Sequence, residues 1–154
     1  MRAWLAGFVC VATACAGSPR SVEPAPEPEA FQPRVSSDEQ RTGDALDRLM
    51  TACADGDLAT AASGIVDRDL PSSAWHRAMD IEEPGRREAV ESLCQRVNGM
   101  RRGADYERVA YRKERQSARL WHLCTVRYAS DEAEIYAFLE IDGQMLLGDI
   151  DPAR

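Results

Sequence analysis

Residues 134–150 read EIYAFLEIDGQMLLGDI, two apolar runs joined by Asp142-Gly143. Both runs are rich in Ile, Leu, Phe and Tyr, which favour β-strands. An Asp-Gly pair between such runs is a strong hairpin signal, because Gly accepts the positive φ that a type I′ turn requires. The stretch therefore predicts a hairpin of strands Glu134–Ile141 and Met145–Ile150.

Two more stretches of the same character precede this hairpin. They cover Tyr106–Glu114 and Leu120–Tyr128, and short polar connections separate them from each other and from the hairpin. Strands in such close succession predict an antiparallel meander of four strands.

The chain before residue 104 has a helical period instead. Ser37 followed by Gln40 is a capping-box pattern, and it predicts a helix from Ser37 that ends at Asp55-Gly56. The apolar residues of this helix recur at helical spacing: Ala45, Leu46, Leu49, Met50 and Cys53. Asp57 is expected to cap a second, shorter helix through Ala62.

A third strong helix is predicted after Pro84-Gly85, ending at Gly103. It carries an apolar stripe: Ala89, Val90, Leu93, Cys94, Val97 and Met100. Between the second and third helices, residues 65–70 predict a short strand and residues 73–79 a turn of helix. The expected fold class is α+β, with N-terminal helices packed on a curved antiparallel meander sheet. The sheet has four strands, or five to six if this region adds to it.

The N-terminus resembles a bacterial lipoprotein signal. Arg2 precedes an apolar run, Ala3–Ala14, that is too short to span a bilayer, and small residues stand just before Cys15. The expectation is a signal peptide over 1–14, a Pro/Glu-rich disordered tether over 15–36 and one domain over 37–154. The protein would then be attached through lipidated Cys15 to a membrane of the envelope, by resemblance the outer one.

Two other outcomes of the signal stay open. Ala12 stands where the lipoprotein pattern prefers Leu or another bulky aliphatic residue. Cleavage after Ala12-Thr13-Ala14 or Ala14-Cys15-Ala16 would release a soluble periplasmic or secreted protein, and a retained membrane anchor is the third outcome.

Charge and cysteine content narrow the function classes. A net charge of −7 argues against nucleic acid as a partner. Three of the five cysteines lie in the domain: Cys53, Cys94 and Cys124. In an oxidising compartment a Cys53–Cys94 disulfide is favoured, because both residues lie on apolar helix faces; three buried thiols are the alternative. Neither a CxxC nor a Cys/His cluster occurs, so no metal site is expected.

The order of these elements resembles the nuclear-transport-factor-two-like fold, a cone of three helices wrapped by a curved sheet. The features that carry the resemblance are the Asp55–Leu58 break between helices, the edge strand at 65–70 and the stretch from Phe138 to Asp151. The region around Trp75 and Glu82–Val97 also resembles small bacterial lipoproteins of this shape. Another helix-plus-meander fold is the rival. Some enzymes of the superfamily place Tyr, Asp or His in the cone mouth, but the first helix here has neither Tyr nor His.

Candidate site residues follow from the aromatic and titratable side chains. Five aromatic residues are expected to line a cone cavity: Trp75, Tyr111, Trp121, Tyr128 and Phe138. Candidate acid/base groups are His76 and His122, with the pairs Asp67/Asp69 and Asp149/Asp151. The arginines on and after the third helix (Arg86, Arg87, Arg96, Arg101 and Arg102) are interpreted as a solvated face.

No catalytic set and no cofactor motif emerges from these residues. The favoured hypothesis is a non-enzymatic lipoprotein whose domain binds a small apolar ligand or an envelope protein. The alternatives are a small acid/base enzyme that uses the cone cavity and a structural or assembly protein without a ligand.

Overall fold

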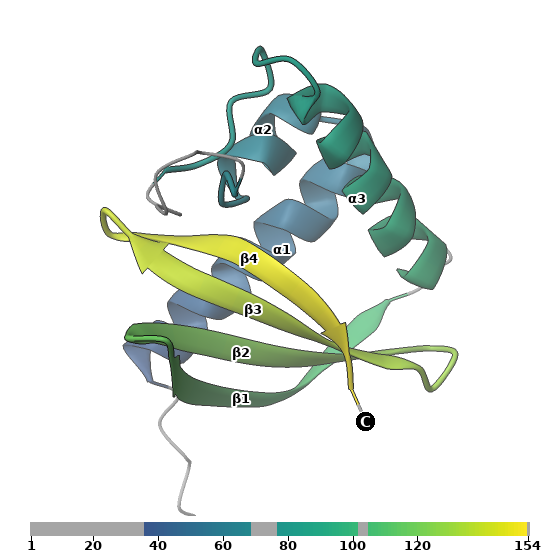
Figure 1. Ribbon diagram of the computed structural model, residues 1–154. Helices are drawn as coiled ribbons and strands as arrows, with labels where there is room; N and C mark the ends of the chain where they lie inside the picture. Colours follow the sequence, from purple (N-terminus) through teal and green to yellow (C-terminus); the bar gives the residue numbers. More distant parts are fainter. Residues whose placement is uncertain (1–35, 69–76, 102–104, 154) are drawn as a thin grey trace, which may run out of the picture. The chain divides into compact units, whose positions relative to one another are not determined.

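The computed structural model describes residues 36–68, 77–101 and 105–153. Three helices come first: α1 (Ser37–Asp55), α2 (Leu58–Ser63) and α3 (Arg86–Arg101). Four strands follow: β1 (Tyr106–Gln116), β2 (Arg119–Tyr128), β3 (Ala133–Ile141) and β4 (Gln144–Pro152). The strands form one antiparallel meander in the order β1-β2-β3-β4, and the helices lie on one side of it (Figure 1). The predicted α+β class and the four-stranded meander are confirmed.

Helix boundaries follow local hydrogen bonding. The side chain of Ser36 accepts a hydrogen bond from the Glu39 amide at 3.1 Å, so the N-cap lies one residue before the predicted Ser37. Ser36 takes this role because its backbone is extended while Ser37 is already helical. Gly56, with φ of 72°, ends α1 as predicted, and Asp57 caps α2 through the Thr60 amide.

The β3–β4 turn has the geometry that Asp142-Gly143 predicts. Asp142 has φ of 50° and Gly143 has φ of 79°, so both central residues occupy the positive-φ region of a type I′ turn. Ile141 then pairs with Gln144, and the register continues to Glu134 and Pro152 with one irregularity between Ala137 and Phe138.

The chain between α2 and α3 adds only a short extension to the sheet. Ile65 forms a parallel bridge with Leu147 of β4, and Val66 forms an antiparallel bridge with Ala78. The predicted strand at 65–70 is thus reduced to isolated bridges, and the part from residue 69 lies outside the described residues. Most of the predicted turn of helix at 73–79 lies outside them as well.

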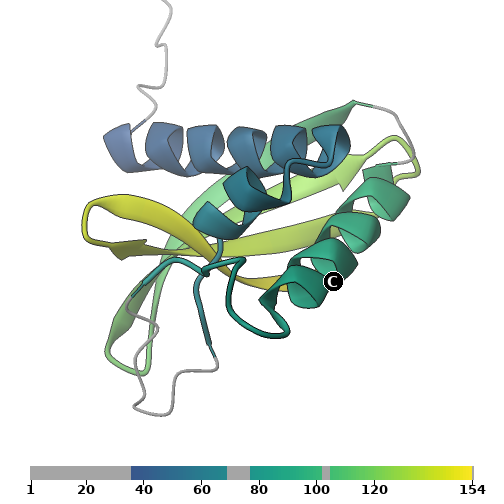
Figure 2. The ribbon, with the colours of Figure 1, turned by 90° about the horizontal axis from the view of Figure 1, so that it is seen from above.

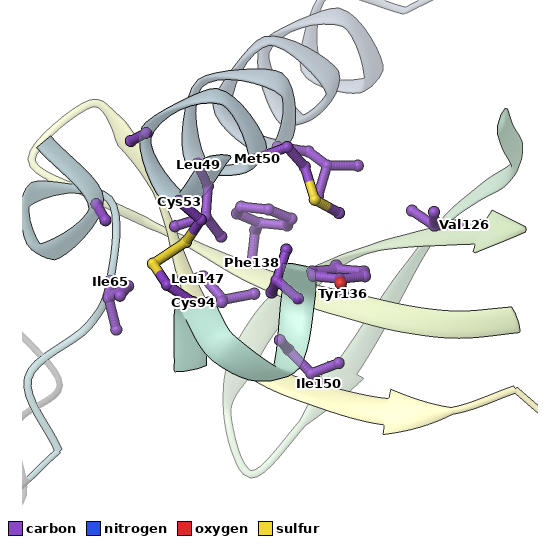
Figure 3. Packing of buried hydrophobic residues seen from close by; sticks show 14 of the residues in the cluster. Leu49, Met50, Cys53, Ile65, Cys94, Val126, Tyr136, Phe138, Leu147 and Ile150 are labelled. Atoms are coloured by element: carbon purple, nitrogen blue, oxygen red, sulfur yellow. A yellow bond between two sulfur atoms is a disulfide. The ribbon is translucent and has the colours of Figure 1, made fainter. Parts of the chain in front are cut away.

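The main core lies between the helices and the sheet. Seen from above, α1 runs along the sheet, with α2 and α3 on the same side (Figure 2). Leu49 and Met50 of α1 meet Tyr136 and Phe138 of β3 in this core, and Cys53 of α1 is bonded to Cys94 of α3 (Figure 3). The disulfide that the sequence favours is therefore present. It joins α1 to α3 through two cysteines that are 41 residues apart in the chain.

A second apolar cluster lies on the other face of the sheet. It contains Trp121 and Leu123 of β2 with Ala137 and Leu139 of β3. Side chains alternate between the two faces of a strand, so these residues point away from the main core. Gly148 belongs to this packing, because a Cβ atom there would lie 2.7 Å from the Trp121 ring.

Candidate functional site

A pocket of about 400 Å³ lies between α3 and β4. Its apolar lining comes from α3, from β4 and from the segments at residues 65–66 and 79: Ile65, Val66, Met79, Ala89, Val90, Leu93, Leu147 and Ile150. The polar side chains among the described lining residues are Arg68, Ser92, Arg96 and Asp149. A pocket of this size, lined by apolar side chains together with a few polar groups, is typical of a small-molecule site.

Helix α3 contributes two adjacent faces to the domain. Val90, Cys94 and Val97 are buried toward the core. Ala89, Leu93 and Arg96, spaced by four and three residues, line the pocket on the neighbouring face. Beyond the disulfide, Asn98 Nδ2 donates a 2.9 Å hydrogen bond to the Cys53 carbonyl, so α3 is attached firmly to α1.

Another wall of the pocket is the segment at residues 64–68, which backbone hydrogen bonds tie to the sheet. The Val66 amide donates to the Leu147 carbonyl at 2.8 Å, and the Leu147 amide donates to the Gly64 carbonyl at 2.7 Å. The Met79 amide donates to the Ile65 carbonyl at 2.8 Å. Because these bonds hold Ile65 and Val66 against β4, this side of the pocket is preformed.

Asp67 connects this wall to the start of α3. Its side chain is fully buried, and its oxygens lie 3.0 Å from Arg86 Nη2 and 3.3 Å from Arg77 Nη2. A buried carboxylate requires such partners, so Asp67 is a counter-ion for two guanidinium groups. Asp69, its partner in the predicted carboxylate pair, lies outside the described residues.

Arg96 is held by a buried network beside the pocket. Its Nη2 and Nε lie 2.7 and 3.2 Å from Glu134 Oε1, and Nη2 lies 3.4 Å from the Ile150 carbonyl. The hydroxyls of Tyr128 and Tyr136 each lie 3.1 Å from Glu134 Oε2 and 2.5 Å from each other. Burial raises the pKa of both phenols, so they stay protonated and can donate to the carboxylate.

Two side chains occupy the outer edge of β4 next to the pocket. Asp149 Oδ1 accepts a hydrogen bond from the Ile150 amide at 3.0 Å, and Arg96 approaches the Ile150 carbonyl. Arg68 forms a 3.2 Å ion pair with the other oxygen of Asp149. An added strand has no access to these backbone groups, so the site is better suited to a small molecule than to an extended peptide.

A separate polar cluster joins the first turn of α1 to the sheet. Asp38 pairs with Arg41 at 2.8 Å and Lys113 at 2.5 Å, and Arg41 also pairs with Glu140 at 2.8 Å. The hydrogen bond from Lys113 lowers the pKa of Asp38 to about 2. Buried His122 lies nearby, with Nδ1 2.8 Å from the Tyr111 hydroxyl, and burial lowers the pKa of its imidazole.

Cys124 lines a polar groove beside this cluster, together with Gly43 and Arg108. The thiol is free and buried, and burial raises its pKa to about 11. Because the thiolate is the nucleophilic form, Cys124 is unreactive at neutral pH and acts as a small apolar residue, as expected from its strand position.

The aromatic residues that the sequence singles out are distributed over three places. Tyr128 and Phe138 are in the main core, Tyr111 is in the groove beside α1, and Trp121 is on the opposite face of the sheet. None of these four lines the α3–β4 pocket. Trp75 lies outside the described residues, as do His76, Cys15, Arg102 and the segments 1–14 and 15–35.

Three residues in or beside the pocket belong to patterns that are visible in the sequence. Leu93 belongs to the apolar stripe predicted for α3, and it packs against the main core as well as lining the pocket. Arg96 was interpreted as part of a solvated face. Glu134 and Tyr136 alternate on one face of β3, and this spacing could have placed the carboxylate beside the core.

The chain matches no known family model and no curated protein sequence. Within the described ranges, no group of three or more His, Cys, Asp and Glu side chains could hold a metal ion. Among the described helices, none has the length and hydropathy needed to cross a bilayer.

Proposed function

We propose that this protein is a non-enzymatic lipoprotein of the bacterial envelope whose domain binds a small apolar ligand in the α3–β4 pocket. The observation that carries the proposal is the pocket's lining. Eight apolar residues line a space of about 400 Å³, and hydrogen bonds and a disulfide support its walls.

The N-terminal sequence supports export and attachment. Cys15 follows a short apolar run and small residues, and the Pro/Glu-rich stretch after it would serve as a tether to the domain. The proposal includes a relationship to the nuclear-transport-factor-two-like fold and to small bacterial lipoproteins of that shape. The three helices and the Ile65–Leu147 bridge at the sheet edge support it.

Ligand binding is tested with an apolar fluorescent probe, N-phenyl-1-naphthylamine. The protein is the exported chain carrying Cys15→Ser, which is purified without detergent. Ser92 is an exposed lining residue, so Ser92→Trp is expected to fill the pocket and weaken probe binding at least about tenfold. Gln95→Trp, an exposed α3 position outside the pocket lining, is the matched control and should bind normally. Equal probe affinity in both variants would refute ligand binding at this site.

Membrane attachment is tested by metabolic labelling with palmitate. The unaltered protein should incorporate label, and Cys15→Ser should not. Equal labelling of the two proteins, or none in either, would contradict the lipoprotein proposal while leaving the pocket experiment valid.

A further inference from the structure

We propose that the ligand is a single-chain amphipath with an anionic head group, which is bound at Arg96 while the chain lies among the apolar lining residues. This inference rests on the proposed function and adds a charge and a size to the ligand. Four observations support it: the fixed position of Arg96, its uncommitted donors, the balance of accessible charges and the volume of the pocket.

The Arg96 guanidinium is positioned before any ligand arrives. Nε and Nη2 face Glu134 Oε1, and Nη2 also approaches the Ile150 carbonyl. Glu134 is itself held by the two tyrosine hydroxyls. A side chain fixed in this way loses little conformational entropy when it binds an anion.

Part of the guanidinium stays available. Within the described part of the chain, Arg96 Nη1 has no hydrogen-bond partner, and the side chain is 48% exposed while its carboxylate partner is only 5% exposed. The two N–H groups of Nη1 can donate to a carboxylate or phosphate oxygen. An anionic head group would accept hydrogen bonds from them and form an ion pair with the guanidinium.

The accessible charges of the pocket disfavour a cationic head group. Two arginines and one aspartate are among the described lining residues, although the whole chain carries a net charge of −7. Asp149 accepts a hydrogen bond from the Ile150 amide and pairs with Arg68, so the charges of Asp149 and Arg68 offset each other and Arg96 is the lining charge whose partner lies outside the lining. Glu134 is buried behind Arg96 and does not line the pocket.

The volume limits the apolar part of the ligand. A space of about 400 Å³ is near the lower end of the range for small-molecule sites, which extends to about 1,000 Å³. It suits one medium-length alkyl chain and is too small for a two-chain membrane lipid. The inferred ligand is thus a free single-chain amphipath such as a fatty acid.

The test is displacement of N-phenyl-1-naphthylamine at pH 7.5 from the exported Cys15→Ser chain. Three competitors share one chain length: decanoate, decanol and decyltrimethylammonium. Decanoate should bind about tenfold more tightly than decanol, because its carboxylate forms an ion pair with the Arg96 guanidinium, whereas the decanol hydroxyl only accepts a hydrogen bond from it. The cationic competitor should bind most weakly.

Two variants assign the preference to Arg96. Glu134→Gln removes the competing carboxylate but keeps an acceptor for the tyrosines, so decanoate affinity should rise several-fold. The double variant Arg96→Gln/Glu134→Gln leaves no buried charge unpaired, and decanoate and decanol should then bind equally. Decanol affinity should change much less than decanoate affinity in both variants, and continued binding of the probe shows that the pocket is intact.

The outcomes separate the two proposals. Equal displacement by decanoate and decanol from the unaltered domain would overturn the anionic head group but support an apolar ligand. A preference for decanoate over decanol that survives in the double variant would likewise overturn binding of the head group at Arg96 but support an apolar ligand. If the probe does not bind at all, both proposals fail.

Discussion

Helices α1 and α3 have similar lengths, 19 and 16 residues, but they are attached to the domain in different ways. Helix α1 buries seven residues and contacts both β2 and β4. Helix α3 buries only Val90, Cys94 and Val97, and its main contacts are with α1 and α2. The comparison shows that the pocket exists because α3 is attached to its neighbouring helices rather than packed along the sheet.

The polar contacts of α1 and α3 also differ, because those of α1 are partly exposed and that of α3 reaches a buried carboxylate. At α1, Arg41 and Asp38 are partly exposed and supplement a large apolar interface. At α3, Arg96 reaches a buried carboxylate and forms a main link between this helix and the sheet. Disulfide and polar contacts thus replace apolar burial at α3, which leaves apolar surface available to a ligand.

The disulfide gives the largest expected effect. Replacing both of its cysteines, Cys53→Ala/Cys94→Ala, should lower the free energy of unfolding by about 4 kcal/mol, the value expected for a loop closed over 41 residues. The α3 amides should also exchange with solvent faster than the α1 amides. Denaturant unfolding and hydrogen exchange measure the two effects.

Cys124→Ala is the control for this double variant. It removes a buried thiol that closes no loop, so the free energy of unfolding should fall much less. Amide exchange in α3 should not become faster than in α1. If the amides of α1 and α3 exchange faster to the same extent in the double variant, then packing, and not the disulfide, holds α3 in place.

The same substitution in the two helices measures their burial. Leu49 of α1 is 2% exposed, so Leu49→Ala should cost about 3 kcal/mol through lost burial and a cavity. Leu93 of α3 is only partly buried and already faces the pocket, so Leu93→Ala should cost about 1 kcal/mol. Urea unfolding decides the comparison, and equal losses would contradict it.

The fold was largely readable from the sequence because its signals are local. The turn at Asp142-Gly143 depends on the positive φ of these two residues, and Asp57 caps a helix through an amide three residues away. The alternation of apolar residues along a strand is visible within a few positions. The Cys53–Cys94 pairing was also favoured, since both residues lie on apolar helix faces. The cap at Ser36 was missed by one residue, because Ser36 and Ser37 are equivalent until backbone geometry selects one.

The pocket was not readable in the same way. Its walls depend on where α3 lies relative to β4, and that position arises from contacts between residues far apart in the chain. Arg96 and Glu134 are 38 positions apart, and nothing local indicates that they meet. The aromatic residues do not indicate where the pocket lies, because an aromatic residue in a core and one that lines a pocket have the same sequence pattern.

A matched pair of arginine substitutions compares the polar contacts. Arg96→Gln leaves Glu134 buried without its charged partner and should cost about 2 kcal/mol. Arg41→Gln breaks ion pairs whose partners stay hydrated and should cost far less. Thermal or urea unfolding of both variants measures the difference. A larger loss of unfolding free energy in Arg41→Gln than in Arg96→Gln would show that the α1 contact stabilises the domain more than the α3 contact.

The smallest effect concerns pH and should be larger in α1 than in α3. Buried His122 faces Tyr111 and Lys113 of β1, Asp38 and Arg41 of α1, and Glu140 of β3.

Burial lowers the His122 pKa, so the folded domain binds this proton more weakly than the unfolded chain does. Stability is therefore fully present above the ordinary histidine pKa of about 6.5 and should fall as the pH drops below it. The decline should be modest, and it should be visible as a lower urea midpoint at pH 5 than at pH 7.

His122→Gln removes the titrating group and should flatten this dependence between pH 7 and pH 5. Over the same range, α1 amides should lose protection after correction for intrinsic exchange rates. The α3 amides should lose less, because the described contacts of α3 with the sheet include no histidine. A steep pH dependence that persists in His122→Gln would place the responsible proton elsewhere, and equal loss of protection in both helices would show that they open as one unit.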